Sequence, residues 1–416
     1  MKRIIPAVLS ILIPAAMLFT AIAMLPHAES KSENISSEKV NSKTEEVTEC
    51  TETIKNKNEE REQEMIGIWV PCMCLDMTGT NRSESAWKDK ITKIMDDVKA
   101  FGTNTVFFHV RPFSDAIYPS EYYPFSHIIS GKQGKEVDYD PLKIAIETAH
   151  EKGLSFHAWI NPLRVSISAL PDKLSNDNPI NKLIDENGDS MTIVCDGQTF
   201  LDPSYSEVRR LICDGVRELV RNYDLDGVHI DDYFYPTEDL SVDSIEYKSY
   251  KASAGDAALT QQEWRQQNIN SLICGMYEAT HTKKGCKFGI SPQCNIENDY
   301  KMSADVRTWC SENGYCDYIC PQTYVSVNHP LFPFNNFAET WRKMTTAKGV
   351  RLYFGLALYK AGSNDDSGTW KDTDDNLKRE VSYIRSIKSD GFALFSYEQL
   401  SSDAAKSELD NLRQVM

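Results

Sequence analysis

Short runs of β-branched and aromatic residues recur between residues 65 and 400, and segments with helical periodicity separate them. Eight of these runs are long enough to form a strand. They are IGIWVPC (66–72), TNTVFFHVRP (103–112), LSFHAWINP (154–162), DGVHIDDYFY (226–235), KFGISPQCN (287–295), CDYICPQTY (316–324), RLYFGLALYK (351–360) and GFALFSYEQL (391–400). Eight strands that alternate with helices, without a second pattern, predict an α/β fold, a (β/α)8 TIM barrel, as a single catalytic domain.

The stretch GVHIDDYFYP (227–236) departs most from the expected composition of a buried parallel strand. Such a strand should be almost entirely apolar, yet this one carries His229, Asp231 and Asp232 and continues into aromatic residues that include Tyr233. Buried carboxylates are costly unless the strand opens into a polar cleft. In a TIM barrel that cleft lies at the C-terminal ends of the strands. The stretch therefore predicts catalytic carboxylates there.

The alternation of side chains along a strand predicts which residues face the barrel axis. If Val228 and Ile230 face the helices, His229 and Asp231 face the axis. The same phase on the other strands predicts a set of inward or rim residues, namely His109, Arg111, His157, Trp159, Asn161, Ser291, Gln322, Tyr324, Tyr359 and Glu398. Aromatic rings stack on sugar faces and polar groups bind hydroxyls, so this mixture is typical of a carbohydrate cleft.

Glycoside hydrolysis requires two carboxyl groups that flank the scissile bond. Asp231 is the predicted nucleophile or base, because a strand fixes it, and the neighbouring Asp232 is predicted to hold a loop or an arginine. The candidates for the acid partner are Asp115, Glu398, Glu297 and Asp299. Arg111 is expected to pair with Asp115 at the cleft, since both lie where the second strand ends.

The N-terminal residues have a different composition. Lys2 and Arg3 precede a weakly polar run over residues 4–25, so residues 1–28 are predicted to be a signal peptide or a membrane anchor. Residues 29–64 are polar and without periodicity, which is typical of a disordered linker. The barrel domain is expected over residues 65–416. We therefore expect the protein to be secreted, or anchored to the outer face of the cytoplasmic membrane through residues 4–25.

Charge and cysteine content narrow the function classes. The chain has 61 acidic and 45 basic residues, which argues against nucleic acid or an anionic membrane surface as the main partner. Its eleven cysteines are odd in number and show no tight metal-ligand spacing, so most are predicted to be reduced and structural. No cofactor is expected, and the protein is predicted to be a monomer with a polysaccharide substrate.

Several motifs, taken in order, resemble those of the glycosyl-hydrolase-like 10 domain family. They are RPFSDAIYPSEYYPFSHIISGKQGKEVDYDPL, AHEKGLSFHAWINPLR, DGVHIDDYFYP, FGISP and YICPQTY, and the resemblance extends over about residues 65–400. It implies a TIM barrel, bacterial export and glycosidase activity, with peptide-free peptidoglycan glycan strands as the substrate of one branch. The motif positions that it implies for the site are Arg111, Asp115, His157, Asn161, Arg164, Asp231, Asp232 and Gln322.

GVHID is also similar to the nucleophile motif on the fourth strand of retaining α-glycosidase barrels, where Asp231 would match the nucleophile. FGISP lacks the glutamate that those barrels carry on the fifth strand, so the acid stays unassigned.

Two other functions fit the same residues. His109, His157 and His229 share the inward phase and, with Asp231, could hold a zinc ion in a metal-dependent hydrolase. Against this, the chain lacks the close HxH or HExxH spacings that usually build such sites. A non-catalytic glycan-binding barrel is the second alternative, and it would retain glycan affinity without Asp231.

Overall fold

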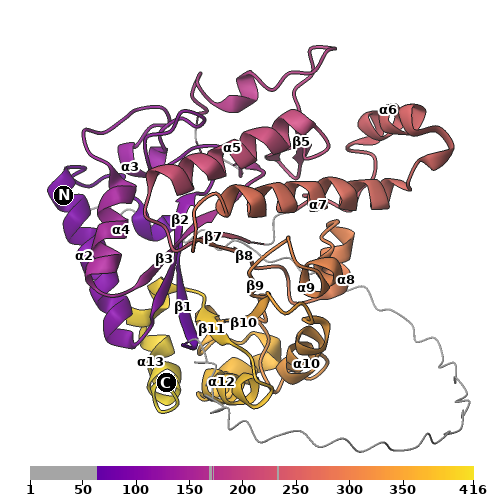
Figure 1. The fold of residues 1–416 in the computed structure, drawn as a ribbon. Coiled ribbons are helices and arrows are strands. Elements are labelled where there is room, and N and C mark those ends of the chain that lie inside the picture. The colour runs from indigo at the N-terminus through magenta and orange to yellow at the C-terminus, as the bar shows by residue number, and fades with distance from the viewer. Residues whose placement is uncertain (1–62, 168–170, 172, 232–233) are drawn as a thin grey trace, which may run out of the picture. The chain divides into compact units, whose positions relative to one another are not determined.

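The structure is a computed structural model that describes residues 63–167, 171, 173–231 and 234–416. Eight parallel strands close into a barrel, which confirms the predicted fold class (Figure 1). The order around the barrel is β1-β11-β10-β9-β8-β7-β3-β2. The strands are β1 (Met65–Val70), β2 (Thr105–Arg111), β3 (Ser155–Ile160), β7 (Gly227–Ile230), β8 (Lys287–Ile290), β9 (Tyr318–Ile319), β10 (Arg351–Leu356) and β11 (Gly391–Leu394). Each of the eight predicted segments overlaps one of them, and β1 begins one residue earlier than predicted.

Helices separate the strands and pack around the barrel (Figure 1). The longer ones are α2 (Glu84–Phe101), α4 (Pro141–Glu151), α5 (Ser206–Asn222), α6 (Ser244–Ala254), α7 (Gln261–Thr280), α10 (Phe334–Met344), α12 (Asn376–Ser386) and α13 (Lys406–Arg413). The shorter ones are α1 (Cys72–Leu75), α3 (His127–Ser130), α8 (Ile296–Lys301), α9 (Val306–Ser311) and α11 (Thr369–Asp372). Six 3-10 turns complete the set: η1 (Pro179–Asn181), η2 (Gly255–Ala257), η3 (Leu358–Lys360), η4 (Asp366–Gly368), η5 (Tyr397–Ser401) and η6 (Asp403–Ala405).

Helix α2 illustrates how local sequence sets the boundaries of these helices. It begins after Ser83, whose hydroxyl accepts a hydrogen bond from the backbone N–H of Ala86. It ends at Gly102, whose φ of 107° lies in the left-handed region that favours glycine. Its buried residues recur at helical spacing, as Trp87, Ile91, Ile94, Met95, Val98 and Phe101. The helix therefore buries one apolar stripe against the barrel.

Two long connections add structure on the side where the strands end. The connection after β3 forms a small antiparallel sheet of β4 (Arg164–Ser166), β6 (Gln198–Leu201) and β5 (Thr192–Cys195), in that order. The connection after β7 contains α6, which projects from the end of α7 (Figure 1). In a TIM barrel these loops surround the active site.

Buried side chains form two separate apolar clusters. The larger one fills the layer between the barrel and the helices and contains Val228 and Ile230, as the alternation predicted. The smaller one fills the barrel interior with Met65, Trp69, Phe107, Trp159, Tyr318, Cys320 and Ala393. Glycines make room for these rings, because a Cβ at Gly289 would lie 1.8 Å from Cζ of Tyr318.

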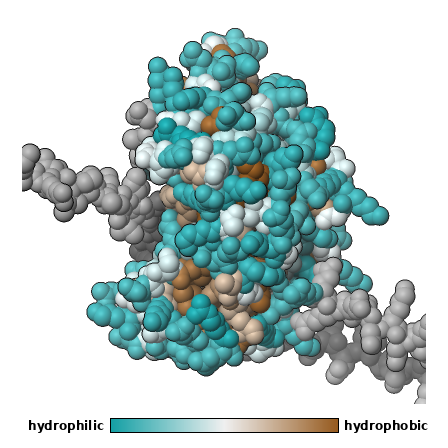
Figure 2. Space-filling model, turned by 90° about the vertical axis from the view of Figure 1, so that its left-hand side faces the viewer, coloured by the Kyte–Doolittle hydropathy of each residue, from teal (hydrophilic) through white to brown (hydrophobic). Residues whose placement is uncertain are grey.

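The surface is mainly polar. The face in Figure 2 is mostly hydrophilic, and hydrophobic residues occupy small areas between polar ones. Within the part of the chain that is described, no helix is long and apolar enough to cross a bilayer. The predicted anchor (residues 4–25) and nearly all of the predicted linker (residues 29–62) lie outside the described residues.

Candidate active site

Asp231 follows the last residue of β7 directly and is almost buried, at 6% exposure. Two side chains from β3 and its C-terminal end donate hydrogen bonds to its Oδ2 atom. These are Nε1 of Trp159 at 3.2 Å and Nδ2 of Asn161 at 2.5 Å. Donors of this kind hold a carboxylate in one orientation and favour its ionised form. The structure thus brings together three of the residues that the sequence placed in the site.

Asn161 is itself held from two sides. His109 of β2 contacts its Oδ1 atom through Nε2 at 2.8 Å, and Arg164 of β4 donates to the same oxygen. The His109 ring stacks on Trp159 with centroids 3.7 Å apart. Burial lowers the pKa of His109 well below its usual value, and the charge of Arg164 lowers it further. His109 is therefore a neutral imidazole at physiological pH.

A second histidine group lies along the barrel axis. The Tyr318 hydroxyl lies 2.8 Å from Nδ1 of His157 and 3.0 Å from Nδ1 of His229, and Nε1 of Trp69 donates to Nε2 of His229 at 3.2 Å. Burial lowers the pKa of His157 to about 4 and the pKa of His229 well below its usual value. Trp69 and Tyr318 were not among the predicted site residues. Trp69 could have been found, because it alternates with Ile68 and Val70 on its strand.

The zinc alternative requires the three histidines to point nitrogen atoms at a common centre. Instead, five of their six ring nitrogens contact other protein groups: both of His109, both of His229 and Nδ1 of His157. Among the described residues no group of three or more His, Cys, Asp or Glu side chains is arranged to hold a metal ion. The geometry of these histidines is that of a hydrogen-bonded interior.

The prediction that Arg111 faces the axis is wrong. The pairing of β2 with β3 shifts between His109 and Arg111, so that His109 is opposite Trp159 but Arg111 is opposite Ile160. This irregularity turns Arg111 to the helix side. Its guanidinium lies over the Tyr123 ring, 4.3 Å from the centroid, and a Cβ at Gly215 of α5 would lie 2.7 Å from its Nη1 atom. Arg111 is a buried residue of the outer layer.

The predicted pair of Arg111 and Asp115 is not formed either. Asp115 has no exposed surface, and its Oδ2 atom accepts from Nε2 of Gln133 at 3.1 Å and lies 3.3 Å from Nδ1 of His127. A general acid must reach the substrate, so this burial argues against Asp115 as the acid. Asp115 instead joins the connection after β2 to Gln133, which accepts from the backbone N–H of Ser175 at 2.8 Å.

The other candidate acids differ in exposure. Glu398, on η5 just after β11, is exposed, and the Cys74 thiol donates to it at 3.5 Å. Glu297 is also exposed and lies 3.9 Å from Arg307. Asp299 is buried and accepts from the backbone N–H of Gln293 at 3.0 Å. Asp232 and Tyr233 lie outside the described residues.

Aromatic side chains gather after β9, β10 and β11. The Tyr324 ring meets the Tyr359 ring edge-on at 5.7 Å, and both contact Phe395, at 5.8 and 6.0 Å. Tyr359 is 39% exposed. Of the polar residues predicted nearby, Gln322 is partly buried and donates to the backbone of Ser291, whose hydroxyl donates to the backbone of Cys320. The three rings form an aromatic platform at this part of the rim.

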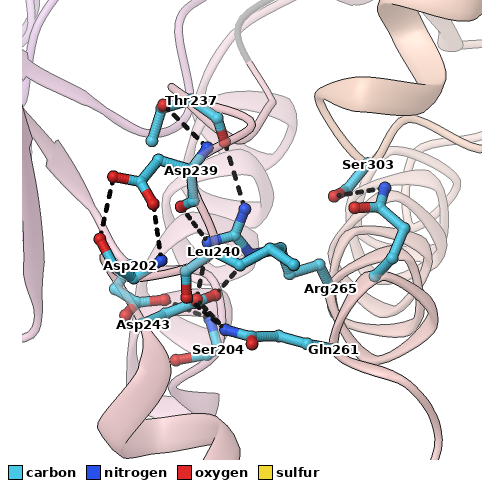
Figure 3. Close-up of polar contacts among 11 residues, drawn as sticks. Asp202, Ser204, Thr237, Asp239, Leu240, Asp243, Gln261, Arg265 and Ser303 are labelled. Carbon is cyan, nitrogen blue, oxygen red and sulfur yellow. Dashed lines mark hydrogen bonds and ion pairs between the residues drawn. The ribbon is translucent and has the colours of Figure 1, made fainter.

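The loop that follows Asp231 is anchored by Arg265 of α7, a residue that the sequence analysis did not single out. The buried guanidinium makes two hydrogen bonds to the Asp243 carboxylate, 2.7 and 2.6 Å long, and donates to the backbone oxygens of Thr237 and Asp239 (Figure 3). Gln261 also donates to Asp243, at 2.7 Å (Figure 3). No sequence signal marks this contact, because the two segments meet only in the folded chain.

Comparison with known sequences gives a family match and two similar relatives. Residues 64–372 match the profile of a family described as glycosyl hydrolase-like 10. The chain is 32% identical over 352 residues to the glycosyl hydrolase YngK of Bacillus subtilis, a match that covers 80% of this chain and 67% of that protein. It is 33% identical over 324 residues to the glycosyl hydrolase DigH of Escherichia coli K12, covering 71% of each.

Solved structures resemble the chain in fold. The glycoside hydrolase domain of PgaB from Bordetella bronchiseptica aligns with a TM-score of 0.54 and 12% identity, over 84% of this chain and 99% of that domain. The catalytic domain of β-amylase from Paenibacillus polymyxa aligns with a TM-score of 0.55 and 11% identity, over 84% and 97%. Both likenesses concern the barrel architecture.

Proposed function

The chain belongs to the glycosyl hydrolase-like 10 family, and from this premise we propose that it is an exported glycoside hydrolase of peptide-free peptidoglycan glycan strands. Asp231 serves as its nucleophile or general base. One observation carries this role: Asp231 leaves β7 at the end of the barrel where active sites of this fold lie, and Trp159 and Asn161 both donate to its Oδ2 atom. A fixed, ionised carboxylate is what nucleophilic or base catalysis requires.

We assign the acid role to Glu398. It is exposed, and its strand β11 lies on the opposite side of the barrel from β7, four positions away in the strand order. Carboxyl groups on opposite sides of the mouth can flank a glycosidic bond that lies between them. Asp115 and Asp299 are buried, and Glu297 lies on α8 beside Arg307, which makes these three weaker candidates.

The substrate class rests on the rim and on the family. Tyr324, Tyr359 and Phe395 offer apolar ring faces on the side where the strands end, and sugar rings bind to such faces. The long connections after β3 and β7 supply walls for an extended polymer. The peptidoglycan substrate itself is implied by the resemblance of the motifs to the family. Arg111 has no part in binding it, because its guanidinium lies in the outer layer.

The test compares the wild type with Asp231→Asn on peptide-free glycan strands, peptide-bearing strands and chitin-type oligomers. We expect turnover of peptide-free strands by the wild type. In the variant we expect a loss of several orders of magnitude without a change in Tm, because the substitution keeps the shape and removes the charge. Binding of strands by the wild type without turnover of any of the three substrates would favour a glycan-binding barrel instead.

Export is a separate part of the proposal and rests on the basic and apolar composition of residues 2–25. Cell fractionation of the full chain, with N-terminal sequencing of the product, tests it. We expect the protein outside the cytoplasm, either cleaved near residue 28 or retained at the membrane. A full-length protein in the cytoplasmic fraction would contradict export and leave the hydrolase assignment intact.

A further inference from the structure

We propose that His109 is a positioning residue for Asp231, acting through the Asn161 amide, and does not contact the sugar. The inference rests on the proposed function, in which Asp231 is the reacting carboxylate. The sequence alone placed His109 among the substrate-binding residues. Its contacts in the structure support a different role, because they define a chain of hydrogen bonds that runs in one direction and ends on Asp231.

The chain begins at a backbone N–H group. The N–H of Cys72, at the start of α1, donates to Nδ1 of His109 over 3.4 Å. A backbone N–H only donates, so Nδ1 must accept, and the proton of the neutral ring lies on Nε2. Nε2 in turn lies 2.8 Å from Oδ1 of Asn161. The ring therefore donates to the amide, and its tautomer is fixed by the connection after β1.

The Asn161 amide has only one orientation compatible with its neighbours. Its Oδ1 atom receives hydrogen bonds from both His109 and Arg164, and each of these groups is a donor. The Nδ2 group must then point the other way, where it donates to Oδ2 of Asp231 over 2.5 Å. An inverted amide would place donors against donors and an oxygen against a carboxylate.

His109 also supports the second donor to Asp231. Its ring stacks on Trp159 at an interplanar angle of 12°, and Nε1 of Trp159 donates to the same carboxylate oxygen. The His109 side chain is 2% exposed, which leaves no free edge for a sugar hydroxyl. One buried ring thus holds both groups that orient the carboxylate.

This series of hydrogen bonds from Cys72 through His109 and Asn161 should affect the pKa of Asp231. Hydrogen bonds donated to a carboxylate stabilise its charged form. When the donation from Asn161 is weakened, the pKa of Asp231 should rise, and the acid limb of the kcat/KM profile should move to higher pH. Packing around the ring does not predict such a shift, so the pH profile separates positioning from a structural role.

Two substitutions separate the functions of the ring. His109→Phe keeps an aromatic ring to stack on Trp159 but removes the donor. His109→Gln keeps an amide N–H near the position of Nε2 but removes the stacking ring. We expect His109→Phe to lower kcat about 10-fold with little change in KM, which is the upper end of the effect expected for the loss of a neutral hydrogen bond. We also expect the acid limb of the kcat/KM profile to move to higher pH. His109→Gln should keep the wild-type acid limb.

A matched control is His229→Phe. His229 is also a buried histidine of the barrel interior, but its nitrogens contact Trp69 and Tyr318. We expect the acid limb of the kcat/KM profile of His229→Phe to lie at the same pH as in the wild type. An increase of KM in both His109 variants, with an unmoved acid limb, would assign His109 to substrate binding and overturn the proposal. Wild-type kinetics in His109→Phe would mean that the ring only packs against Trp159, and this result would also overturn the proposal.

A readout that is independent of activity separates this proposal from the proposed function. Long-range ¹H–¹⁵N NMR of the wild-type protein should find His109 as the neutral tautomer with its proton on Nε2 between pH 5 and 8. A proton on Nδ1, or a charged ring in that range, would overturn the chain of hydrogen bonds. If the protein turned over no glycan, the hydrolase proposal would fail, while this spectrum would still test the chain.

Discussion

Polar groups are buried in two regions of this molecule, the barrel interior and the layer between the barrel and the helices. The hydrogen bonding of these groups differs between the two regions. Inside the barrel, His109, Asn161 and Asp231 are joined by hydrogen bonds of defined direction. In the layer between the barrel and the helices, the Arg111 guanidinium lies beside Tyr118 and Tyr123, and neither carboxyl oxygen of Glu380 has a hydrogen-bond partner among the described residues. Buried polar groups cost stability unless they are hydrogen-bonded.

This difference in hydrogen bonding indicates which buried polar groups are better candidates for a functional role. Neighbouring side chains hold the interior groups in defined orientations through hydrogen bonds, whereas the outer groups are accommodated by ring contacts or by a shifted pKa. The Arg111 guanidinium lies on the face of the Tyr123 ring. Burial raises the pKa of Glu380 well above its usual value, with Glu408 adding to the effect, which favours the neutral form of this carboxyl. A buried charge is thus a weaker sign of function than a connected network.

Among the variants that test this comparison, the largest effect is expected for an interior residue that orients Asp231. Asn161→Ala removes the shorter of the two hydrogen bonds to Asp231 and leaves His109 and Arg164 without their common acceptor. We expect kcat on peptide-free glycan strands to fall about 10- to 100-fold, as for the loss of a hydrogen bond to a charged group. Steady-state kinetics at constant pH measures it. An unchanged kcat would mean that the network does not position the carboxylate.

The next effect concerns the outer layer and appears as pH-dependent stability. Burial raises the pKa of Glu408 to about 7, and its Oε1 atom accepts from the backbone N–H of Leu377 over 2.5 Å. A carboxyl whose pKa is raised on folding binds more protons in the folded state, so its contribution to stability is full below the unfolded pKa of about 4.5. That contribution falls as pH rises through about 7.

We expect Glu408→Gln to remove this part of the pH dependence, on the order of 3 kcal/mol between pH 4.5 and 8, because an amide does not ionise. Urea unfolding at several pH values measures the free energy of unfolding, and the same substitution at the exposed Glu312 is the control. If Glu408→Gln and the wild type showed the same dependence of the free energy of unfolding on pH, the pKa of Glu408 would not be raised in the folded protein.

The smallest effect is expected for Arg111→Met. The substitution removes a charge that touches Tyr123 and Gly215 rather than the barrel interior. We expect kcat and KM on peptide-free strands to stay within about threefold of the wild type, because only the Arg111 backbone oxygen, which the substitution keeps, contacts Asn161, while the guanidinium lies over Tyr123. A large rise in KM on these strands would restore Arg111 to the substrate site and remove the distinction between the two regions.

The sequence could predict the barrel because the fold repeats one local pattern eight times. Each strand and helix has its own periodicity, so one wrongly predicted strand or helix would not have changed the predicted fold class. The same alternation correctly placed His229 toward the axis and Val228 and Ile230 toward the helices, because β7 pairs in regular register with both neighbours.

Arg111 shows where this reasoning stops. One irregularity between His109 and Arg111 reverses the side to which the last residue of β2 points. A bulge depends on how neighbouring strands pair, and that pairing leaves no mark in a single strand's sequence. For the same reason the Arg265 anchor and the contact between Tyr318 and two histidines could not be predicted, since each joins segments that are far apart in the chain.

The central claim is that a glycan reacts at Asp231, inside the barrel mouth. A crystal structure of Asp231→Asn with a peptide-free glycan oligomer tests it most directly, because the variant binds the substrate without cleaving it. We expect one anomeric carbon to face the side chain at position 231, at about 3–3.5 Å or through a single water molecule. An anomeric carbon that faces Asp115 or Glu297 instead, with position 231 away from the sugar, would contradict the account.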